Sequence, residues 1–338
     1  MEEMFFKGEF MIVKTRIYES TGFDPYRNLA VEKRLMDTTA PGECTLYLWQ
    51  NQNTVVIGRN QNAWAECRTS LLAQENGVLA RRLSGGGAVF HDLGNLNFTF
   101  MMNREDYDLD RQLLVIQKAC ALAGIRAEKS GRNDLLAEGR KFSGNAFYHN
   151  STHAYHHGTL LIRVDMDKLQ RYLSPPKAKL EAKGIASVRS RVVNLSELAP
   201  GLTIDQMKTY MIEAFRQVYG CTPAAVILTP EDEAQVQALT VQYGSWDYLY
   251  GAPLAFSFDA QSHFSWGHFQ LQLEAKGGVI TAARVYSDAM DWQIAAAVEQ
   301  ALTGCRFEPG AMESALGAGI QEQQIREDLC SFLSQQQL

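Results

Sequence analysis

The sequence has little that is typical of membrane, secreted or nucleic-acid-binding proteins. None of its apolar runs approaches the roughly 18–20 residues that span a bilayer. Residues 1–10 have neither a basic segment followed by an apolar stretch nor a small-residue cleavage site, so export is not expected. The net charge of −6 and the pI of about 5.7 argue against general nucleic-acid binding. We therefore expect a cytoplasmic protein with no membrane and no nucleic-acid partner.

Cysteine pairs are also missing. The six cysteines form no Cys-x-x-Cys motif and lie far apart, at Cys44, Cys67, Cys120, Cys221, Cys305 and Cys330. Free buried thiols are therefore expected in place of disulfides or a cysteine metal site. Internal repeats and low-complexity tracts are absent as well, which argues against a solenoid. A chain of 338 residues, 46% of them hydrophobic and 21% charged, predicts two globular domains.

Periodicity and turn signals predict a mixed α+β protein. Asp24 and Pro25 are expected to begin a helix through position 36, and Thr203 to cap another. The other predicted helices cover 64–75, 109–123, 231–241, 294–302 and 321–333. Strands are predicted at 45–49, 54–57, 78–83, 88–90, 96–102, 159–164, 256–258, 269–273 and 279–286, with a linker at 246–253. Because strands follow one another more often than they alternate with helices, the sheet should be largely antiparallel.

One glycine-rich segment combines features of an anion site. Residues 81–92 read RRLSGGGAVFHD, and three consecutive glycines allow backbone N–H groups to converge on an anion. Arg81 and Arg82, which are separated from the triplet by two residues, can add fork-shaped donors for phosphate or carboxylate. The segment is no dinucleotide fingerprint, since position 90 is Phe90, and no Gly-Lys-Ser/Thr of a P-loop occurs. For a glycine triplet alone, a flexible hairpin or bulge is the alternative.

Three further segments carry charge or metal-ligand residue types. Lys141, in the run KFSGNA, can present a compact positive charge to a cleft. His149, His153 and His157 are spaced by four, but the glycine and the β-like run after His157 favour a turn entering a strand over a metal site. The stretch 175–191 is the most basic of the chain, and its composition permits either a solvated face or a mobile loop.

Taken together and in this order, these segments resemble bacterial lipoate–protein ligase A. The matching stretches are 81–95 (RRLSGGGAVFHDLGN), 131–135 (GRNDL), 141–146 (KFSGNA), 156–161 (HHGTLL) and 182–194 (AKGIASVRSRVVN). The similarity runs from about position 18 to the C-terminus and is weakest in about the last hundred residues. One departure is Phe142, where the family usually has a β-branched residue.

The resemblance implies an α+β fold with two domains. A catalytic domain of the biotin/lipoate-ligase type, with a core like that of class II aminoacyl-tRNA synthetases, is expected at 1–247, and a small α+β accessory domain at 252–338. The implied reaction is ATP-dependent activation of lipoate to lipoyl-AMP, releasing pyrophosphate, followed by transfer of the lipoyl group to a lysine of an acceptor protein. Such an enzyme serves to scavenge lipoate.

The resemblance also implies cofactors and partners. Mg²⁺ is expected to accompany ATP, and no protein ligand is assigned to it. The implied acceptors are the lipoyl domains of 2-oxoacid dehydrogenase acyltransferase subunits and the glycine-cleavage H protein. We expect the enzyme to be a monomer.

Roles for single residues follow from the same resemblance. Lys141 is implied as the catalytic residue, which touches both lipoate and the adenylate. The residues expected to bind ATP are Arg82, Gly87, Ala88, Val89, Phe90 and Lys141. Those expected to bind lipoate are Ser84, Gly85, Gly86, His91, Lys141 and His157. Lys183 and Arg189 are implied as parts of a loop over the adenylate, and further site candidates are Arg81, Asn133, Asp134, Gly158 and Thr159.

Elementary chemistry agrees with these roles. The lipoate carboxylate must approach the α-phosphate of ATP, and two anions repel each other unless cations stand between them. Lys141, Arg82 and Mg²⁺ can supply that positive charge in the transition state. The mixed anhydride hydrolyses readily, so the site has to exclude water. The lipoate tail needs an apolar slot, for which Val89, Phe90 and Phe147 are candidate walls.

Three other functions stay open. An octanoyltransferase of related fold would use a cysteine nucleophile and no ATP, but no cysteine occurs between Cys120 and Cys221, a span that holds four of the matching blocks. A biotin–protein ligase would need a Gly-Arg-Gly-Arg-x-Gly loop, which is absent. A non-catalytic binding module is disfavoured by Arg82, the glycine triplet and Lys141. ATP–pyrophosphate exchange is expected only for the ligase.

Overall fold

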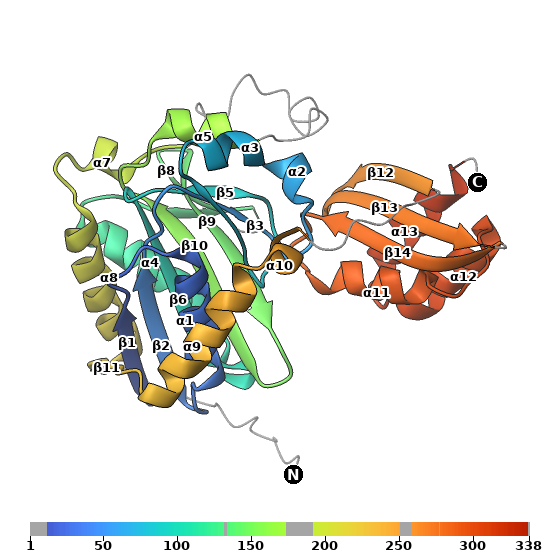
Figure 1. Cartoon of the computed structure of the whole chain (residues 1–338). Helices are drawn as coiled ribbons and strands as arrows, with labels where there is room; N and C mark the ends of the chain where they lie inside the picture. The colour runs from blue at the N-terminus through green and yellow to red at the C-terminus, as the bar shows by residue number, and fades with distance from the viewer. Residues whose placement is uncertain (1–11, 132–133, 174–191, 251–257, 277, 337–338) are drawn as a thin grey trace, which may run out of the picture. The chain divides into compact units, whose positions relative to one another are not determined.

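The strands of the described residues form three sheets, one of eight strands and two of three strands each, and Figure 1 shows how helices surround them. The structure, a computed structural model, describes residues 12–131, 134–173, 192–250, 258–276 and 278–336. Helices and mainly antiparallel strands occur together, which confirms the predicted α+β class.

The largest sheet has the strand order β11-β1-β2-β6-β10-β9-β8-β7. Its strands span Lys14–Glu19 (β1), Glu43–Trp49 (β2), Asn95–Asn103 (β6), Glu128–Ser130 (β7), Asp134–Ala137 (β8), Arg140–His149 (β9), His153–Leu161 (β10) and Ala224–Ala225 (β11). β1 pairs in parallel with β2 and β11, whereas the neighbouring pairs from β2 to β7 are antiparallel. Along the central strands β2, β6 and β10, successive side chains point to opposite faces of the sheet and therefore contact different elements.

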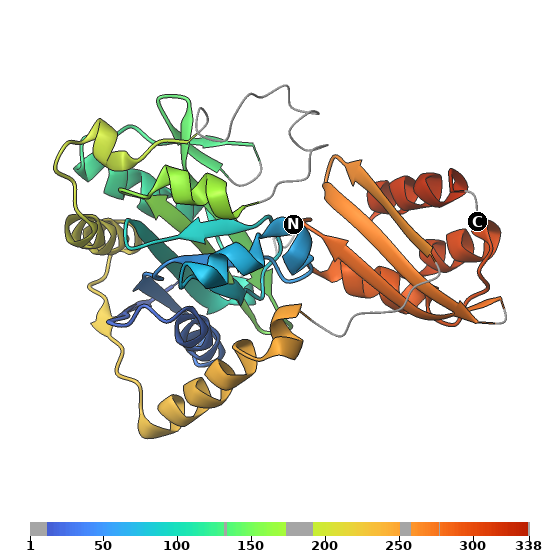
Figure 2. The ribbon, with the colours of Figure 1, turned by 45° about the horizontal axis from the view of Figure 1, so that its top comes forward.

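Different helices cover the two faces of this sheet. α4 (Leu109–Leu122) and α8 (Ile204–Tyr219) pack on each other and form an apolar core with side chains of β2 and β6. α1 (Pro25–Asp37) contacts β2, β6 and β10 from the opposite face, and α9 (Pro230–Tyr243) lies beside α1 in both views (Figures 1 and 2). Alternate residues of a central strand thus point either into the core or toward α1.

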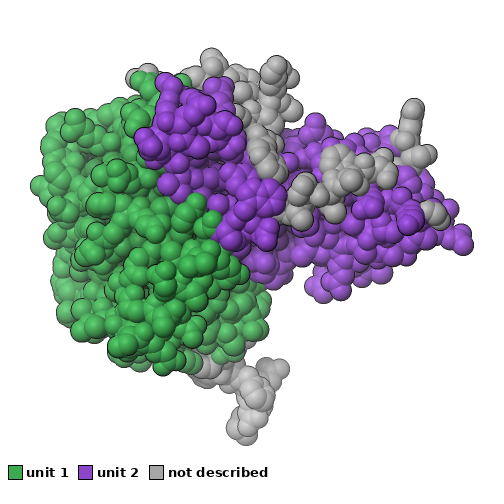
Figure 3. Space-filling view, in the orientation of Figure 1, with its two compact units in different colours: residues 1–54, 91–170, 187–244 green, residues 55–90, 171–186, 245–338 purple. Residues whose placement is uncertain are grey.

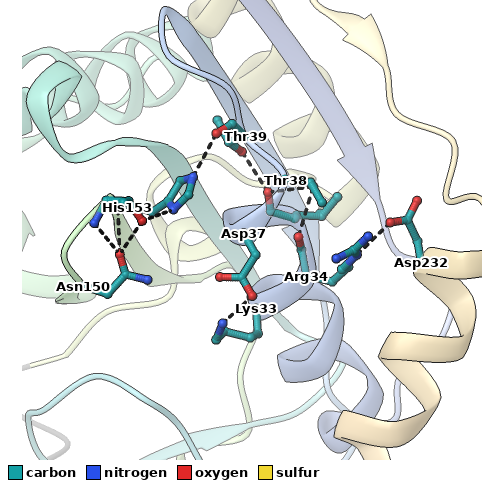
Figure 4. Close-up of polar contacts among 10 residues, drawn as sticks. Lys33, Arg34, Asp37, Thr38, Thr39, Asn150, His153 and Asp232 are labelled. Carbon is teal, nitrogen blue, oxygen red and sulfur yellow. Dashed lines mark hydrogen bonds and ion pairs between the residues drawn. The ribbon is translucent and has the colours of Figure 1, made fainter.

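Polar contacts fix α1 in place (Figure 4). Arg34 Nε donates to Asp232 Oδ1 of α9 at 2.7 Å. His153 Nε2, at the start of β10, lies 3.0 Å from the carbonyl oxygen of Thr39. These contacts tie α9 and β10 to the end of α1, so the helix face that looks at the sheet is held in a defined position.

The predicted helix starts are confirmed. Asp24 is the N-cap of α1 and accepts from Tyr26 N, with Pro25 in the first turn. Thr203 caps α8 and accepts from the backbone N–H of Gln206, whose side chain accepts from Thr203 N in return. Such reciprocal caps satisfy backbone donors that the helix itself leaves unpaired.

A second sheet, with the order β4-β3-β5, carries the glycine-rich segment between two of its strands. It comprises β3 (Thr54–Ile57), β4 (Val78–Arg81) and β5 (Val89–His91). The single helix predicted for 64–75 is wrong, because two short helices, α2 (Ala63–Glu66) and α3 (Thr69–Gln74), occur there. Between them, the backbone N–H of Arg68 donates to the carbonyl of Tyr172, at the end of α5 (Met166–Tyr172). This N–H group therefore makes no bond within a helix, and the helix is interrupted there.

The third sheet and three helices form a second apolar core. The elements are β12 (Phe258–Phe264), β13 (Gly267–Lys276), β14 (Val279–Ser287), α11 (Gln293–Leu302), α12 (Pro309–Gly319) and α13 (Gln323–Ser334). The helices cover one face of the sheet (Figure 2), where they bury Phe269, Leu271 and Leu273. α12 was not predicted. In the predicted linker, residues 246–250 form the helix α10 (Trp246–Tyr250), so the linker prediction is wrong there, and 251–253 lie outside the described residues.

The chain divides into two compact units (Figure 3). Unit 1 comprises residues 1–54, 91–170 and 187–244 and holds the eight-stranded sheet. Unit 2 comprises 55–90, 171–186 and 245–338, so the glycine-rich segment belongs with the C-terminal sheet. The predicted site residues are therefore distributed over both units.

Candidate functional site

Arg82 holds the glycine-rich segment from inside. Its guanidinium is only 6% exposed and donates to the carbonyls of Gly85 at 2.7 Å, Gly87 at 2.8 Å and Val56 at 3.2 Å. Its Nε donates to Ser84 Oγ at 3.0 Å. These bonds satisfy carbonyls that a tight glycine turn cannot pair within itself. The first role of Arg82 is thus to shape the segment whose N–H groups were predicted to meet an anion.

Arg81 braces the neighbouring backbone in the same way. It donates to the carbonyls of Arg59 at 2.8 Å and Gln61 at 2.7 Å, and to that of Tyr248 in α10 at 3.0 Å. Burial lowers the pKa of the guanidinium to about 10, so Arg81 is still cationic at neutral pH. Both arginines of the pair therefore bind main-chain carbonyls of unit 2.

The glycine triplet packs too closely for side chains. A Cβ on Gly85 would lie 2.3 Å from the carbonyl oxygen of Ala289, and Gly86 has φ of +89°, in the region that favours glycine. Gly86 N donates to the Ala289 carbonyl at 3.1 Å. The segment is a packed turn, and one of its N–H groups is paired with the chain that follows β14.

The residues after the triplet lead into β5. Gly87, Ala88 and Val89 are half-buried. Phe90 is 1% exposed and packs against Tyr172, with ring centroids 5.4 Å apart, so its side chain lies in the interior of unit 2. Phe147, the third candidate wall, belongs to β9 of unit 1 and packs against His156 with ring centroids 5.1 Å apart.

Lys141 lies at an accessible part of the β8–β9 pair. Its Nζ is 2.7 Å from Asp134 Oδ1, and the two side chains are 35% and 37% exposed. A Cβ on Gly144 would lie 3.0 Å from this Nζ and 4.0 Å from Thr159 Oγ1, so the ammonium lies across the glycine. Gly144 N donates to Thr159 Oγ1 at 3.2 Å. The structure thus brings together Lys141, Asp134 and Thr159, which the sequence had only placed in separate blocks.

His157 belongs to a buried polar cluster beneath α1. Its Nδ1 lies 2.8 Å from Glu32 Oε1, which also accepts from Thr99 Oγ1 at 2.7 Å. Trp49 Nε1 donates in turn to Thr99 Oγ1 at 3.1 Å. A carboxylate in such a buried place is tolerated because several donors face it. His157 is therefore oriented by Glu32 of α1, which Thr99 of β6 holds in turn.

His91 lies beside the same tryptophan. Its ring meets that of Trp49 edge-on, with centroids 6.3 Å apart, and its Nδ1 is 3.2 Å from Asn51 Nδ2. Asn51 Oδ1 accepts from Asn28 of α1, so the Asn51 amide nitrogen faces the histidine and donates to it. His91 Nδ1 then accepts, and the ring proton is on Nε2.

His156 and Gly158 lie on the face of β10 opposite to His157, where both are close to Asn145 of β9. His156 lies 3.0 Å from Gln112 Oε1 and 2.8 Å from Asn145 Oδ1, and burial lowers the pKa of its imidazole to about 3. A Cβ on Gly158 would lie 2.7 Å from Asn145 Oδ1, so this position needs glycine. His156 is thus neutral and structural at physiological pH.

The predicted turn at His157 is wrong in position, since His149 ends β9, His153 begins β10, and His157 lies inside β10. In the described part of the chain, no group of three or more His, Cys, Asp or Glu side chains is placed to hold a metal ion. Asn133, Lys183 and Arg189 lie outside the described residues.

Sequence reasoning missed several residues of the buried cluster and its surroundings, among them Glu32, Trp49, Asn51 and Thr99. A signal existed for Glu32, which follows Leu29 by three positions and precedes Met36 by four, on the buried stripe of α1. A carboxylate on an otherwise apolar helix face indicates a buried partner. No comparable pattern marks Trp49 or Asn51.

All six cysteines are free, as predicted, but only Cys44, Cys67 and Cys120 are buried, whereas the other three are half-buried. Burial raises the pKa of the thiols of Cys44, Cys67 and Cys120 to about 12, which keeps them protonated.

Among the helices that the described residues form, none is long and apolar enough to cross a membrane.

Comparison with protein families gives two matches. The model of the lipoyl protein ligase A/B catalytic domain matches residues 24–216, and that of the bacterial lipoate protein ligase C-terminus matches residues 254–333. The two matches together cover most of the chain.

Solved structures share the fold. A P. falciparum protein, LipL1, in complex with lipoate has a TM-score of 0.83 and 24% sequence identity, over 95% of this chain and 100% of that one. A bipartite lipoate protein ligase from Thermoplasma acidophilum, described with its E2 lipoyl domain, has a TM-score of 0.64 and 23% identity, over 73% and 100%. A lipoate-protein ligase A bound with ATP has a TM-score of 0.62 and 22% identity, over 70% and 98%.

Proposed function

Because the chain belongs to the lipoyl protein ligase A/B catalytic domain family and carries the C-terminal region of bacterial lipoate protein ligases, we propose how it acts as a lipoate–protein ligase. In the first half-reaction the lipoate carboxylate attacks the α-phosphate of ATP, which yields lipoyl-AMP and pyrophosphate. In the second, the ε-amino group of an acceptor lysine attacks the activated carbonyl and AMP leaves.

The accessible ammonium of Lys141 is the observation that carries this proposal. Its Nζ lies above Gly144, and only the carboxylate of Asp134 is its ion-pair partner among the described residues. A cation that can exchange one anionic partner for another suits a reaction in which carboxylate and phosphate meet. Lys141 would therefore contact the lipoate carboxylate and the α-phosphate.

The glycine-rich segment would serve the nucleotide. Arg82 and the backbone of residues 87–90 are the proposed ATP contacts, and the fixed turn supports this because Arg82 already holds its backbone in place through the carbonyls of Gly85 and Gly87. Residues 84–86, His91 and His157 are proposed on the lipoate side. Lys183 and Arg189 are proposed to cover the adenylate. Mg²⁺ would enter with ATP, whose phosphates would have to supply most of its ligands.

The thiols argue against the rival acyltransferase. That reaction needs a reactive thiolate, whereas burial keeps Cys44, Cys67 and Cys120 protonated. Burial also raises the pKa of the thiols of Cys305 and Cys330, in the C-terminal region. A ligase needs no such nucleophile, because the substrate carboxylate supplies it.

The fold neighbours support the choice of substrates and acceptors. The P. falciparum protein is in complex with lipoate, the lipoate-protein ligase A is bound with ATP, and the Thermoplasma acidophilum ligase has an E2 lipoyl domain. We propose lipoyl domains of 2-oxoacid dehydrogenases and the glycine-cleavage H protein as acceptors, with the enzyme acting as a monomer. Residues 1–247 would form the catalytic domain and 252–338 the accessory domain.

The test is lipoate-dependent ATP–pyrophosphate exchange, followed by mass spectrometry of a purified lipoyl domain. The expected result is exchange only with lipoate present, and a mass increase of one lipoyl group on the domain's lysine only with both lipoate and ATP. Acyl transfer from an octanoylated carrier protein without ATP, in the absence of exchange, would contradict the proposal and identify the acyltransferase instead.

A further inference from the structure

We propose that Asp134 receives the ε-ammonium group of the acceptor lysine and takes its proton during lipoyl transfer. This inference rests on the proposed function, because it concerns the second half-reaction. A lysine side chain with a pKa near ~10.4 is almost entirely protonated at pH 7 and has no lone pair with which to attack a carbonyl carbon. The transfer step therefore needs a proton acceptor beside the activated carbonyl.

Asp134 is placed at the reacting groups by its pairing with Lys141. The two side chains are 2.7 Å apart and both are more than one-third exposed, at 37% and 35%. The register of β8 and β9 puts Asp134 opposite Gly144, whose missing side chain leaves room for the lysine head. A cation that arrives from solvent can thus reach the carboxylate without passing through the sheet.

Charge balance gives the pair an order of events. Without ligand, Lys141 and Asp134 neutralise each other. Once the phosphate of lipoyl-AMP engages Lys141, the carboxylate has lost its counter-charge, and the ammonium of the acceptor lysine restores it. Formation of the adenylate would therefore create the binding site for the acceptor side chain, and the acceptor lysine would bind second.

The histidines of unit 1 are poorer candidates for this task. His156 is fully buried on the other face of the sheet, where burial lowers the pKa of its imidazole to about 3. His157 lies 2.8 Å from Glu32, and its side chain is 8% exposed. His91 is 3% exposed and accepts from Asn51. None of the three offers an accessible atom to an acceptor side chain that comes from another protein.

The proposed step is balanced in atoms and charge. The ammonium first gives one proton to an oxygen of Asp134, which leaves the nitrogen with a lone pair, and the carboxyl group passes this proton to solvent. The neutral amine then attacks, the C–N bond forms, and the C–O bond to phosphate breaks as AMP leaves with the electron pair and the departing phosphate takes the second proton from the nitrogen. Carboxylates are weaker bases than alkylamines by about six pKa units, so the neutral amine is a minor species that the attack on the carbonyl consumes.

The test uses Asp134→Asn and two nucleophiles. Preformed lipoyl-AMP is added to the enzyme, so transfer is measured without adenylation, and the acceptor is either a purified lipoyl domain or hydroxylamine, which is already neutral at pH 7. We expect transfer to the lipoyl domain to fall by at least about 10²-fold at pH 7 and to recover as pH rises, because free amine then becomes available. Capture by hydroxylamine should change by less than about threefold.

Two results would overturn the inference. Equal losses with both nucleophiles, or a loss of ATP–pyrophosphate exchange as large as the loss of transfer, would make Asp134 a positioning residue for Lys141 or for the nucleotide and its metal. Asp134→Glu should restore part of the transfer rate. Asp110→Asn is the matched control, since Asp110 forms an exposed pair with Lys129 at 3.2 Å. A wild-type enzyme that transfers preformed lipoyl-AMP but shows no exchange would refute the proposed function and leave this inference standing.

Discussion

The glycine-rich segment of unit 2 and the β8–β9 pair of unit 1 hold their cations in opposite ways. Arg82 is 6% exposed, and its donors serve the carbonyls of its own segment, including those of Gly85 and Gly87. Lys141 is 35% exposed and meets the carboxylate of Asp134. The arginine is part of a scaffold, whereas the lysine is a charge that a ligand can take over.

This difference separates shape from reactivity. A turn fixed by an internal guanidinium keeps its N–H groups in place before any nucleotide arrives, and such preorganisation favours charge stabilisation. A lysine in an accessible ion pair can change partners as charge moves during the reaction. Substitutions in the first region should therefore act mainly on stability, and those in the second mainly on rate.

Removal of the accessible cation should have the largest effect. In Lys141→Ala, no ammonium is left to stand between lipoate carboxylate and α-phosphate, so adenylation should fall by at least roughly 10²–10³-fold. Lipoate-dependent pyrophosphate exchange measures this loss. The control is Lys129→Ala, which removes an exposed pair with Asp110 and should keep the exchange rate. Near-normal exchange in Lys141→Ala would break the comparison, because the charge would then have to come from elsewhere.

Removal of the buried cation should act first on stability. Arg82→Met keeps the volume but leaves the carbonyls of Gly85 and Gly87 without their donors, which should cost about 3 kcal/mol of unfolding free energy. Urea unfolding followed by fluorescence measures this cost. Arg126→Met, which removes a pair with Glu128 on a 90% exposed side chain, should change stability by less than about 0.5 kcal/mol. Unchanged stability of Arg82→Met, with lost nucleotide affinity alone, would contradict the scaffold role.

The sequence was sufficient for the fold class and for the helix starts, whose signals are local, but not for the largest sheet, in which β1, β7, β8, β9 and β11 were not predicted. Asp24 before Pro25, and Thr203 before an amphipathic run, mark helix starts whatever the rest of the chain does. The same reasoning failed at residues 64–75, where apolar spacing indicates one helix but Arg68 N pairs with Tyr172, about a hundred positions away. It failed again at α10, whose terminal carbonyls accept from Arg81. In both places a distant partner decides the backbone, and a local pattern cannot contain it.

The candidate site shows the same limit. Motif order alone pointed to Lys141, the glycine triplet and Arg82, yet it could not tell which cation is buried. The ion pair of Lys141 with Asp134 depends on the register between β8 and β9. The space for the lysine ammonium depends on the absence of a side chain at Gly144. The Glu32–His157 contact joins residues 125 positions apart. Such pairings arise from the topology of the sheet, which the pattern of a single sequence does not reveal.

Two glycine substitutions sharpen the comparison at a smaller scale. Gly85→Ala would put a Cβ 2.3 Å from the backbone carbonyl of Ala289, which cannot move alone, so the protein should lose about 1–3 kcal/mol of stability. Gly144→Ala would put a Cβ 3.0 Å from the flexible end of Lys141, so the fold should persist while pyrophosphate exchange falls about tenfold. Melting temperatures and exchange rates of both variants decide the matter. Equal destabilisation by the two changes would mean that the β8–β9 pair is as rigid as the glycine-rich segment.

The smallest effect concerns His156 of β10, which contacts Asn145 of β9, the strand that also carries Lys141. A neutral ring donates from one nitrogen only, so one of its two amide partners, Gln112 or Asn145, must present its NH₂ group. With the folded pKa lowered to about 3 and an unfolded value near ~6.5, only the unfolded state takes up the proton between these limits, so stability falls as pH falls. Urea unfolding should show a loss of about 1 kcal/mol from pH 7 to pH 5.5 that His156→Gln lacks. If the wild-type protein instead gained stability relative to His156→Gln as the pH falls from 7 to 5.5, His156 would have to be charged in the folded state and donate from both ring nitrogens. A charged imidazole, and not a neutral one, would then contact Asn145 of β9.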